Sequence, residues 1–337
     1  MTERLTTTST PANSFEDKRV LVTGGLGFIG SNLAHRLVAA GARVTLVDSL
    51  VPAYGGNVYN IRGLENRLHV NVSDVRDAHS MAFLVQDQDY LFNLAGQTSH
   101  LDSMQDPFTD LDINCTAQLR VLEACRQHNP GIIVVFASTR QFYGRPEYLP
   151  VDERHPLHPV DVNGINKMAG EAYHTLYHEV YGVRSCSLRL TNTYGPRMRI
   201  KDARQTFLGI WVRRLLEGDP IEVWDGPQLR DFNYVDDTVT ALLMVAADPA
   251  AHGRAMNLGG DEAVSLVDLA ERLAGLVPGA GFEVLPFPEE RKRIDIGSFY
   301  ADYTAIREAV GWKPQVQLEE GLRQTVDFYR EHLQEYL

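Results

Sequence analysis

Three glycines spaced three residues apart, Gly24, Gly27 and Gly30, constrain the fold of this chain more than any other feature. They follow the apolar run RVLVTGG and open the helical pattern FIGSNLAHRLVAAG. In such a strand–turn–helix unit, the first glycine makes the tight turn, the second admits a pyrophosphate and the third allows close helix packing. The helix N-terminus adds free N–H groups and a partial positive charge. The pattern predicts a dinucleotide site formed by these glycines with Phe28 and Ile29.

An acidic residue, Asp48, ends the next predicted strand, RVTLVDS. A carboxylate at this position accepts hydrogen bonds from the ribose hydroxyls and repels a 2′-phosphate. The sequence therefore favours NAD over NADP. Asp74 and Val75, at the end of the third predicted strand, are candidates to contact the adenine. The alternative for Asp74 is an ordinary turn residue.

Strand and helix patterns alternate from Lys18 to about residue 191, which predicts a Rossmann-type α/β fold, a doubly wound parallel sheet with helices on both faces. The alternation loosens after Tyr194, where we expect a smaller C-terminal substrate domain. We assign residues 1–14 to a flexible tail, 15–191 to the NAD-binding domain with a return segment near 231–246, and 192–337 mostly to the substrate domain.

Composition limits the partners and the location. The formal net charge is -12, which disfavours binding to nucleic acid or to an anionic membrane surface. No apolar run reaches the length that spans a membrane. The three cysteines form no close pair, as is usual in a reducing compartment. We expect a cytoplasmic protein with no nucleic-acid or membrane partner.

Further motifs lie at ordered positions along the chain. They are Leu94-Ala95-Gly96 after the fourth predicted strand, Asn114, Ser138-Thr139 with Tyr143-Gly144, Lys167 with Glu171, RLTNTYGP at 189–196 and RDFNYVDD at 230–237. Together with the glycine loop, they resemble the extended short-chain dehydrogenase/reductase family, the NAD-dependent epimerases and dehydratases of nucleotide sugars. The resemblance covers nearly the whole chain. It implies NAD as cofactor, with Leu94, Ala95, Gly96, Asn114 and Lys167 among its contacts, and a nucleotide sugar as substrate.

The resemblance departs at the catalytic tyrosine. The family places a Tyr four residues before a Lys, so that both lie on one helix face, and a Ser or Thr after the fifth strand. Lys167 and Thr139 match this pattern, but the Tyr position is Asn163. A carboxamide does not titrate near neutral pH and cannot act as a general base. The candidate substitutes are Tyr143, His100 or a water held by Asn163.

Each candidate base has a structural alternative. Tyr143 belongs to a Tyr-Gly pair that suggests packing beneath the loop. A single histidine such as His100, which follows the fourth predicted strand, is more often structural than catalytic.

The two residues after Thr139 bear on the reaction type. The resemblance implies Asp-Glu at these positions in sugar 4,6-dehydratases, and a Glu two places after the Thr in UDP-glucuronate decarboxylases. This chain has Arg140 and Gln141, and we expect Arg140 to pair with an anionic substrate group or a nearby acid. Because neither residue is a carboxylate, dehydration and that form of decarboxylation are disfavoured, and epimerisation at C4 fits the sequence best by elimination. The alternatives are another nucleotide-sugar redox enzyme (a ketoreductase, dehydratase or decarboxylase) and a non-catalytic NAD- or nucleotide-sugar-binding protein.

The candidates for substrate binding are mostly basic residues, and they include Arg140 and its neighbour Gln141. Asn192 and Arg230 match family positions that contact the nucleotide diphosphate, and arginine suits bidentate phosphate binding. Arg293, in the basic run 291–293, is a further candidate, with a solvated surface charge as its alternative.

Two predicted helices, 107–128 and 162–181, form a face that the resembled family commonly uses for dimer contacts. Leu119, Leu122, Leu176 and Tyr177 are the candidate contacts, although some must serve the core. We therefore expect a homodimer.

Overall fold

A seven-stranded parallel sheet dominates the computed structural model, which describes residues 14–52, 54–202, 204–288 and 295–337. The strand order is β10-β6-β5-β4-β1-β2-β3. The strands are β1 (Arg19–Thr23), β2 (Arg43–Asp48), β3 (His69–Val72), β4 (Tyr90–Asn93), β5 (Ile133–Thr139), β6 (Arg184–Leu190) and β10 (Ala255–Asn257). The predicted Rossmann-type fold is confirmed. The predicted tail, 1–14, lies outside the described residues except for Ser14.

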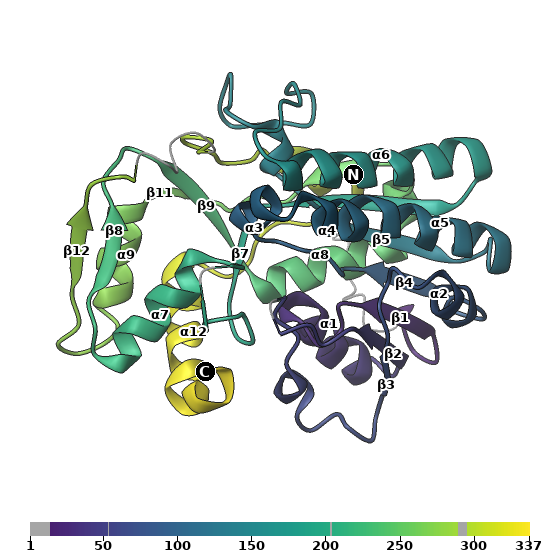
Figure 1. Cartoon of the computed structure of the whole chain (residues 1–337), viewed down its shortest axis with the longest axis horizontal. Helices are drawn as coiled ribbons and strands as arrows, with labels where there is room; N and C mark the ends of the chain where they lie inside the picture. The colour runs from purple at the N-terminus through teal and green to yellow at the C-terminus, as the bar shows by residue number, and fades with distance from the viewer. Residues whose placement is uncertain (1–13, 53, 203, 289–294) are drawn as a thin grey trace, which may run out of the picture.

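Helices cover both faces of this sheet (Figure 1). One face carries α2 (Ala78–Leu84), α5 (Ala117–His128) and α6 (Val162–Tyr181), and the other carries α1 (Phe28–Ala39) and α8 (Val235–Ala247). Side chains alternate along a strand, so Leu21 of β1 packs with the α5 side while Val20 and Val22 pack with the α1 side. Burial on both faces explains the continuous apolar run in β1.

The bounds of the helices were predicted correctly in one case and incorrectly in another. Helix α6 spans the predicted residues, because Asp161 caps its N-terminus and Gly182 ends it in the left-handed conformation. The segment predicted as one helix at 107–128 is instead α4 (Pro107–Leu111), a π-helical turn (Asp112–Thr116) and α5. Such a turn interrupts the helical register, and it carries Asn114 into the interior. The short helix α3 (His100–Gln105) precedes α4.

The predicted dimer residues divide between core and surface. Leu122 is completely buried and Tyr177 is nearly so, and both belong to the core beneath α5 and α6. Leu119 is partly buried against the same core, whereas Leu176 is exposed. Leu122 and Tyr177 are therefore wrong as surface contacts, since their apolar groups are used in folding the monomer.

A smaller part of the chain lies beside the large sheet (Figure 1, left). It holds a three-stranded sheet of β7 (Asn192–Tyr194), β9 (Leu229–Tyr234) and β11 (Ala263–Ser265), and the pair β8 (Ile221–Trp224) and β12 (Phe282–Leu285). Its helices are α7 (Phe207–Glu217), α9 (Leu266–Ala274) and α12 (Leu318–His332), whereas α11 (Thr304–Val310) packs on β10 of the large sheet.

The chain crosses between the two parts more than once. Strand β9 runs directly into α8, which packs on α1 and on the large sheet. Strand β10 joins the same sheet beside β6 and lies beyond the return segment predicted at 231–246. In the described residues, no helix combines the length and apolar character needed to cross a membrane.

Candidate active site

A cavity of about 690 Å³ opens at the carboxyl ends of the parallel strands and extends toward the smaller part of the chain. Parallel α/β sheets bind ligands at this edge, where the loops diverge. The predicted site residues that line it are Gly24, Gly27, Phe28, Ile29, Gly30, Asp48, Asp74, Val75, Leu94, Ala95, Gly96, His100, Thr139, Arg140, Gln141, Asn163, Lys167, Asn192 and Arg230. The fold thus brings together residues that are widely separated in the chain.

The glycine loop has the shape that a pyrophosphate requires. Gly24 has a φ of +66°, and a Cβ added to Gly30 would lie 2.2 Å from the carbonyl oxygen of Gly24. Gly27 is the N-cap of α1, and no side chain caps that helix. The first N–H groups of α1 are therefore left to a ligand at its positive end. This cradle fits a dinucleotide.

Asp48 is held rigidly at the cavity wall. One carboxylate oxygen accepts a hydrogen bond from the N–H of Leu26 (3.0 Å) and the other from that of Leu50 (2.9 Å). Burial raises the pKa of Asp48, with these two N–H groups acting in the opposite direction. Asp74 also lines the cavity, but its carboxylate pairs with Arg76 at 2.6 Å, which lowers the pKa of Asp74.

Lys167 and Thr139 reach the cavity from α6 and from the end of β5. The Lys167 ammonium donates to the carbonyl oxygen of Ala137 (2.9 Å) and lies 4.8 Å from the centre of the Phe136 ring. Burial lowers the pKa of Lys167 to about 8, against the opposing effect of Asp110. The Thr139 hydroxyl oxygen accepts the backbone N–H of Gln141 (3.1 Å).

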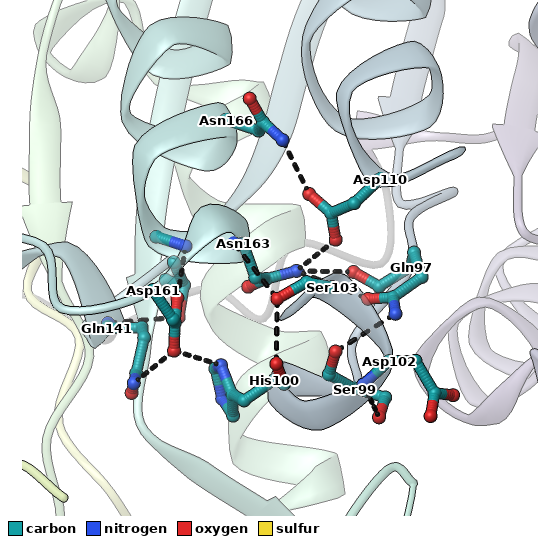
Figure 2. Close-up of polar contacts among 12 residues, drawn as sticks. Gln97, Ser99, His100, Asp102, Ser103, Asp110, Gln141, Asp161, Asn163 and Asn166 are labelled. Carbon is teal, nitrogen blue, oxygen red and sulfur yellow. Dashed lines mark hydrogen bonds and ion pairs between the residues drawn. The ribbon is translucent and has the colours of Figure 1, made fainter. Parts of the chain in front are cut away.

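Asn163 is locked into a buried network (Figure 2). Its amide nitrogen donates to the carbonyl oxygen of Gln97 (2.9 Å) and to Oδ2 of Asp110 (3.1 Å). Asp110, itself fully buried, also accepts from Asn114 (3.0 Å) and Asn166 (2.8 Å). Asn163 thus ties α6 to the loop after β4 and to α4.

Tyr143 does not reach the cavity. Its hydroxyl donates to Asn257 (2.8 Å) and accepts from Arg189, deep in the protein. Burial raises the pKa of Tyr143 to about 12. The prediction of Tyr143 as a substitute base is therefore wrong, because the hydroxyl is engaged on the far side of the loop and is hard to ionise.

Two other predicted residues lie away from the cavity surface. Asn114 is buried behind Gly96, and a Cβ on that glycine would lie 3.0 Å from the Asn114 side-chain oxygen. Asn114 therefore supports the loop from behind and does not line the cavity, which corrects its prediction as a direct cofactor contact. Arg293 lies outside the described residues.

Two arginines line the smaller-domain side of the cavity. Arg140 donates to the side-chain oxygen of Asn192 (3.0 Å), while its Nη1 is buried with no hydrogen-bond partner among the described residues. Arg230 lies 3.5 Å from Asp295 and donates to the carbonyl oxygen of Leu229 (2.9 Å). Burial lowers the pKa of both arginines. This side of the cavity offers guanidinium donors to an anionic ligand.

Sequence reasoning missed Asp161, which stands beside the site. Its side chain is fully buried, and Oδ1 accepts the N–H of Gly164 at the start of α6 (2.7 Å). Oδ2 accepts from Gln141 (2.8 Å) and lies 3.0 Å from Nδ1 of His100. Burial alone would raise the pKa of Asp161, but these partners lower it overall. An Asp directly before a predicted helix is an N-cap signal that would have found it.

Comparison with known proteins assigns the family. The model of the NAD dependent epimerase/dehydratase family matches residues 20–259. The chain belongs to this family. Its predicted cofactor, NAD, and its predicted status as an enzyme are confirmed, and the glycine cradle and Asp48 fit that cofactor.

Relatives of similar identity carry different reaction names. A UDP-glucose 4-epimerase from Mycolicibacterium smegmatis is 34% identical over 316 residues, covering 93% of this chain and 98% of that protein. UDP-glucuronic acid decarboxylase 1 from Xenopus tropicalis is 31% identical over 328 residues, covering 94% of this chain and 73% of that protein. The crystal structure of UDP-glucose 4-epimerase with UDP-glucose from Thermotoga maritima has a chain that is 30% identical in sequence and matches with a TM-score of 0.85. The match covers 94% of this chain and 99% of that one. The family alone does not assign the reaction.

Proposed function

We propose that this chain catalyses the NAD-dependent epimerisation of a nucleotide sugar at C4. One observation carries the proposal: every acidic residue among the described residues that line the cavity already has a partner. Asp48 binds two backbone N–H groups, Asp74 pairs with Arg76, Glu222 with Arg214 and Asp295 with Arg230. Elimination of water calls for an acid and a base, whereas C4 inversion calls for one group that takes and returns a proton.

The side chains in the cavity can bind the cofactor and the substrate for such a reaction. Bound NAD supplies a reversible hydride acceptor. Lys167 presents its ammonium donors to a ribose hydroxyl, and Thr139 presents a hydroxyl to the sugar. Arg140, Asn192 and Arg230 supply polar contacts for the diphosphate and the sugar. Inversion then requires the keto sugar to present its other face to the returning hydride.

Uridine diphosphate sugars are the first substrates to test. The support is the naming of the epimerase relative and the UDP-glucose in the Thermotoga maritima structure. Trp224 and Phe287, whose ring centres lie 5.4 Å apart, line the part of the cavity contributed by the smaller domain and offer apolar surface to a base.

The test incubates the protein with NAD and with UDP-, dTDP-, GDP- and CDP-sugars, and follows the sugar proton signals by NMR. We expect equilibration of one sugar with its C4 epimer, without change of mass. Loss of the C6 carboxylate as carbon dioxide would assign a decarboxylase, and a 6-deoxy-4-keto product would assign a dehydratase. Binding without turnover of any sugar of the panel would contradict the proposed epimerisation.

A further inference from the structure

His100 begins a continuous polar chain that ends at the Thr139 hydroxyl. Its Nδ1 lies 3.0 Å from Oδ2 of Asp161, which accepts from the side-chain amide of Gln141 (2.8 Å) (Figure 2). The backbone N–H of Gln141 in turn donates to the Thr139 hydroxyl oxygen (3.1 Å). His100 and Thr139 both line the cavity. The chain therefore links the imidazole, through Asp161 and Gln141, to the residue that we propose to bind the sugar hydroxyl.

Asp161 determines which nitrogen of His100 is available. The carboxylate is fully buried and fixed by the N–H of Gly164, so it presents a stationary acceptor to Nδ1. A carboxylate beside Nδ1 favours the tautomer with hydrogen on that nitrogen and leaves a lone pair on Nε2. The His100 side chain is 41% exposed and lines the cavity, so Nε2, on the ring edge away from Nδ1, is open to a ligand. A substrate hydroxyl can therefore donate to Nε2.

The backbone of His100 is fixed by the same helix end. Its carbonyl oxygen accepts from the Ser103 hydroxyl (2.7 Å), which itself accepts the backbone N–H of Asn163 (3.3 Å) (Figure 2). Both the ring and the backbone of His100 are thus anchored to the N-terminal end of α6, the helix that also carries Lys167. A group held in this way meets the positional demand of proton transfer.

We propose that His100 is the catalytic proton carrier of this chain and that Asp161 is its positioning residue. The inference rests on the proposed C4 epimerisation. Nε2 of His100 would accept the O4 proton while bound NAD would supply the hydride acceptor for C4, so that the C4–O4 bond becomes a carbonyl. In the reverse transfer, with C4 reduced from its opposite face, His100 would return the proton to O4. Asp161 stabilises the imidazolium that forms between the two steps.

The side chains of Asn163 and Tyr143, the other residues considered at this step, are already engaged. The Asn163 carboxamide does not titrate, and its nitrogen is bound to Gln97 and Asp110. The Tyr143 hydroxyl lies away from the cavity. A relay through His100 therefore replaces the tyrosine with a group from a different element, α3.

The first test compares His100→Gln with His79→Gln, using the panel sugar that the wild type inverts. His79 is exposed on α2 and does not line the cavity. We expect His100→Gln to lower kcat by about 10²–10⁴-fold with little change in KM, and His79→Gln to match the wild type. Added imidazole should restore part of the kcat of His100→Ala, which a merely structural loss would not allow.

The second test compares Asp161→Asn with Asp106→Asn. Both residues cap a helix, Asp161 for α6 and Asp106 for α4, and asparagine is an equally good cap. Only Asp161 contacts a histidine. An amide nitrogen facing Nδ1 would reverse the tautomer and place hydrogen on Nε2. We expect similar unfolding midpoints for the two variants, but a loss of kcat at constant KM in Asp161→Asn alone.

Each outcome bears on a separate claim. A wild type that inverts C4, with a His100→Gln variant that keeps a comparable kcat, overturns the proton-carrier assignment and leaves the proposed function standing. Equal kcat in Asp161→Asn and Asp106→Asn overturns the positioning role. A wild type that inverts no sugar of the panel overturns the proposed function, and the inference with it.

Discussion

At the scale of single residues, Asn163 contributes to stability because it is one of three amide donors to the buried Asp110 carboxylate. Asn163→Ala removes that donor and leaves a charged group less well satisfied. We expect the free energy of unfolding to fall by about 1–3 kcal/mol, as measured by urea denaturation. Asn66→Ala, at an exposed position, should stay within about 0.5 kcal/mol of the wild type. Equal stabilities of the two variants would contradict the network described for Asp110.

Asp48 governs the choice between the two nicotinamide cofactors. Its fixed carboxylate should make NAD bind more tightly than NADP, because it hydrogen-bonds ribose hydroxyls and repels a 2′-phosphate. Asp48→Asn keeps an acceptor for the backbone but removes the charge. A charged hydrogen bond contributes about 1.5–3 kcal/mol, so the preference should narrow by roughly tenfold or more in calorimetry. Tighter NADP binding by the wild type would refute this account.

The sequence identified residues whose roles depend on local pattern. The glycine loop, Asp48, Thr139 and Lys167 all line the cavity. It did not identify Asp161 as a partner of His100, because that contact joins the start of α6 to the start of α3 across 61 positions in the chain. Side-chain networks of this kind depend on tertiary packing, which periodicity does not encode.

At the scale of secondary structure elements, the turn from β1 into α1 is the most constrained. In Gly30→Ala the new methyl would lie 2.2 Å from the Gly24 carbonyl oxygen, a backbone atom that cannot move alone. We expect the loop to shift and the affinity for NAD to fall by at least about tenfold in calorimetry, since the phosphate donors lose alignment. Gly281→Ala, outside the cavity lining, is the control, since its backbone is not left-handed and nothing lies within 4 Å of its added Cβ. It should keep cofactor affinity.

The bounds of a helix were predicted correctly where the residues at its two ends carry recognisable start and stop signals. The α6 bounds follow from Asp161 and Gly182, which supply a cap and a left-handed stop. The break between α4 and α5 was missed because a π turn leaves the apolar pattern of 107–128 nearly unchanged. A one-residue shift in helical register has no signature as clear as a proline or glycine.

At the scale of the whole molecule, the outer face of α6 predicts a homodimer. Ile165, Leu176 and Val180 are 50%, 46% and 60% exposed, and their spacing places them along one side of the helix. An exposed apolar stripe of this kind marks an interaction surface. We expect light scattering to give twice the chain mass at micromolar concentration, and Leu176→Asp to shift the protein toward monomer. Val284→Asp, on the exposed face of β12, should leave the mass unchanged. A monomeric wild type would refute the prediction.

The reaction at C4 is the central claim, and the fate of the hydrogen on that carbon tests it most directly. The measurement supplies the protein and NAD with a UDP-sugar carrying deuterium at C4, and records the product by NMR and mass spectrometry. If one hydride leaves and returns within a single active site, the account predicts an inverted C4 that still carries the deuterium, at unchanged mass. A product with C4 uninverted, or inverted with the deuterium lost to solvent, would contradict it.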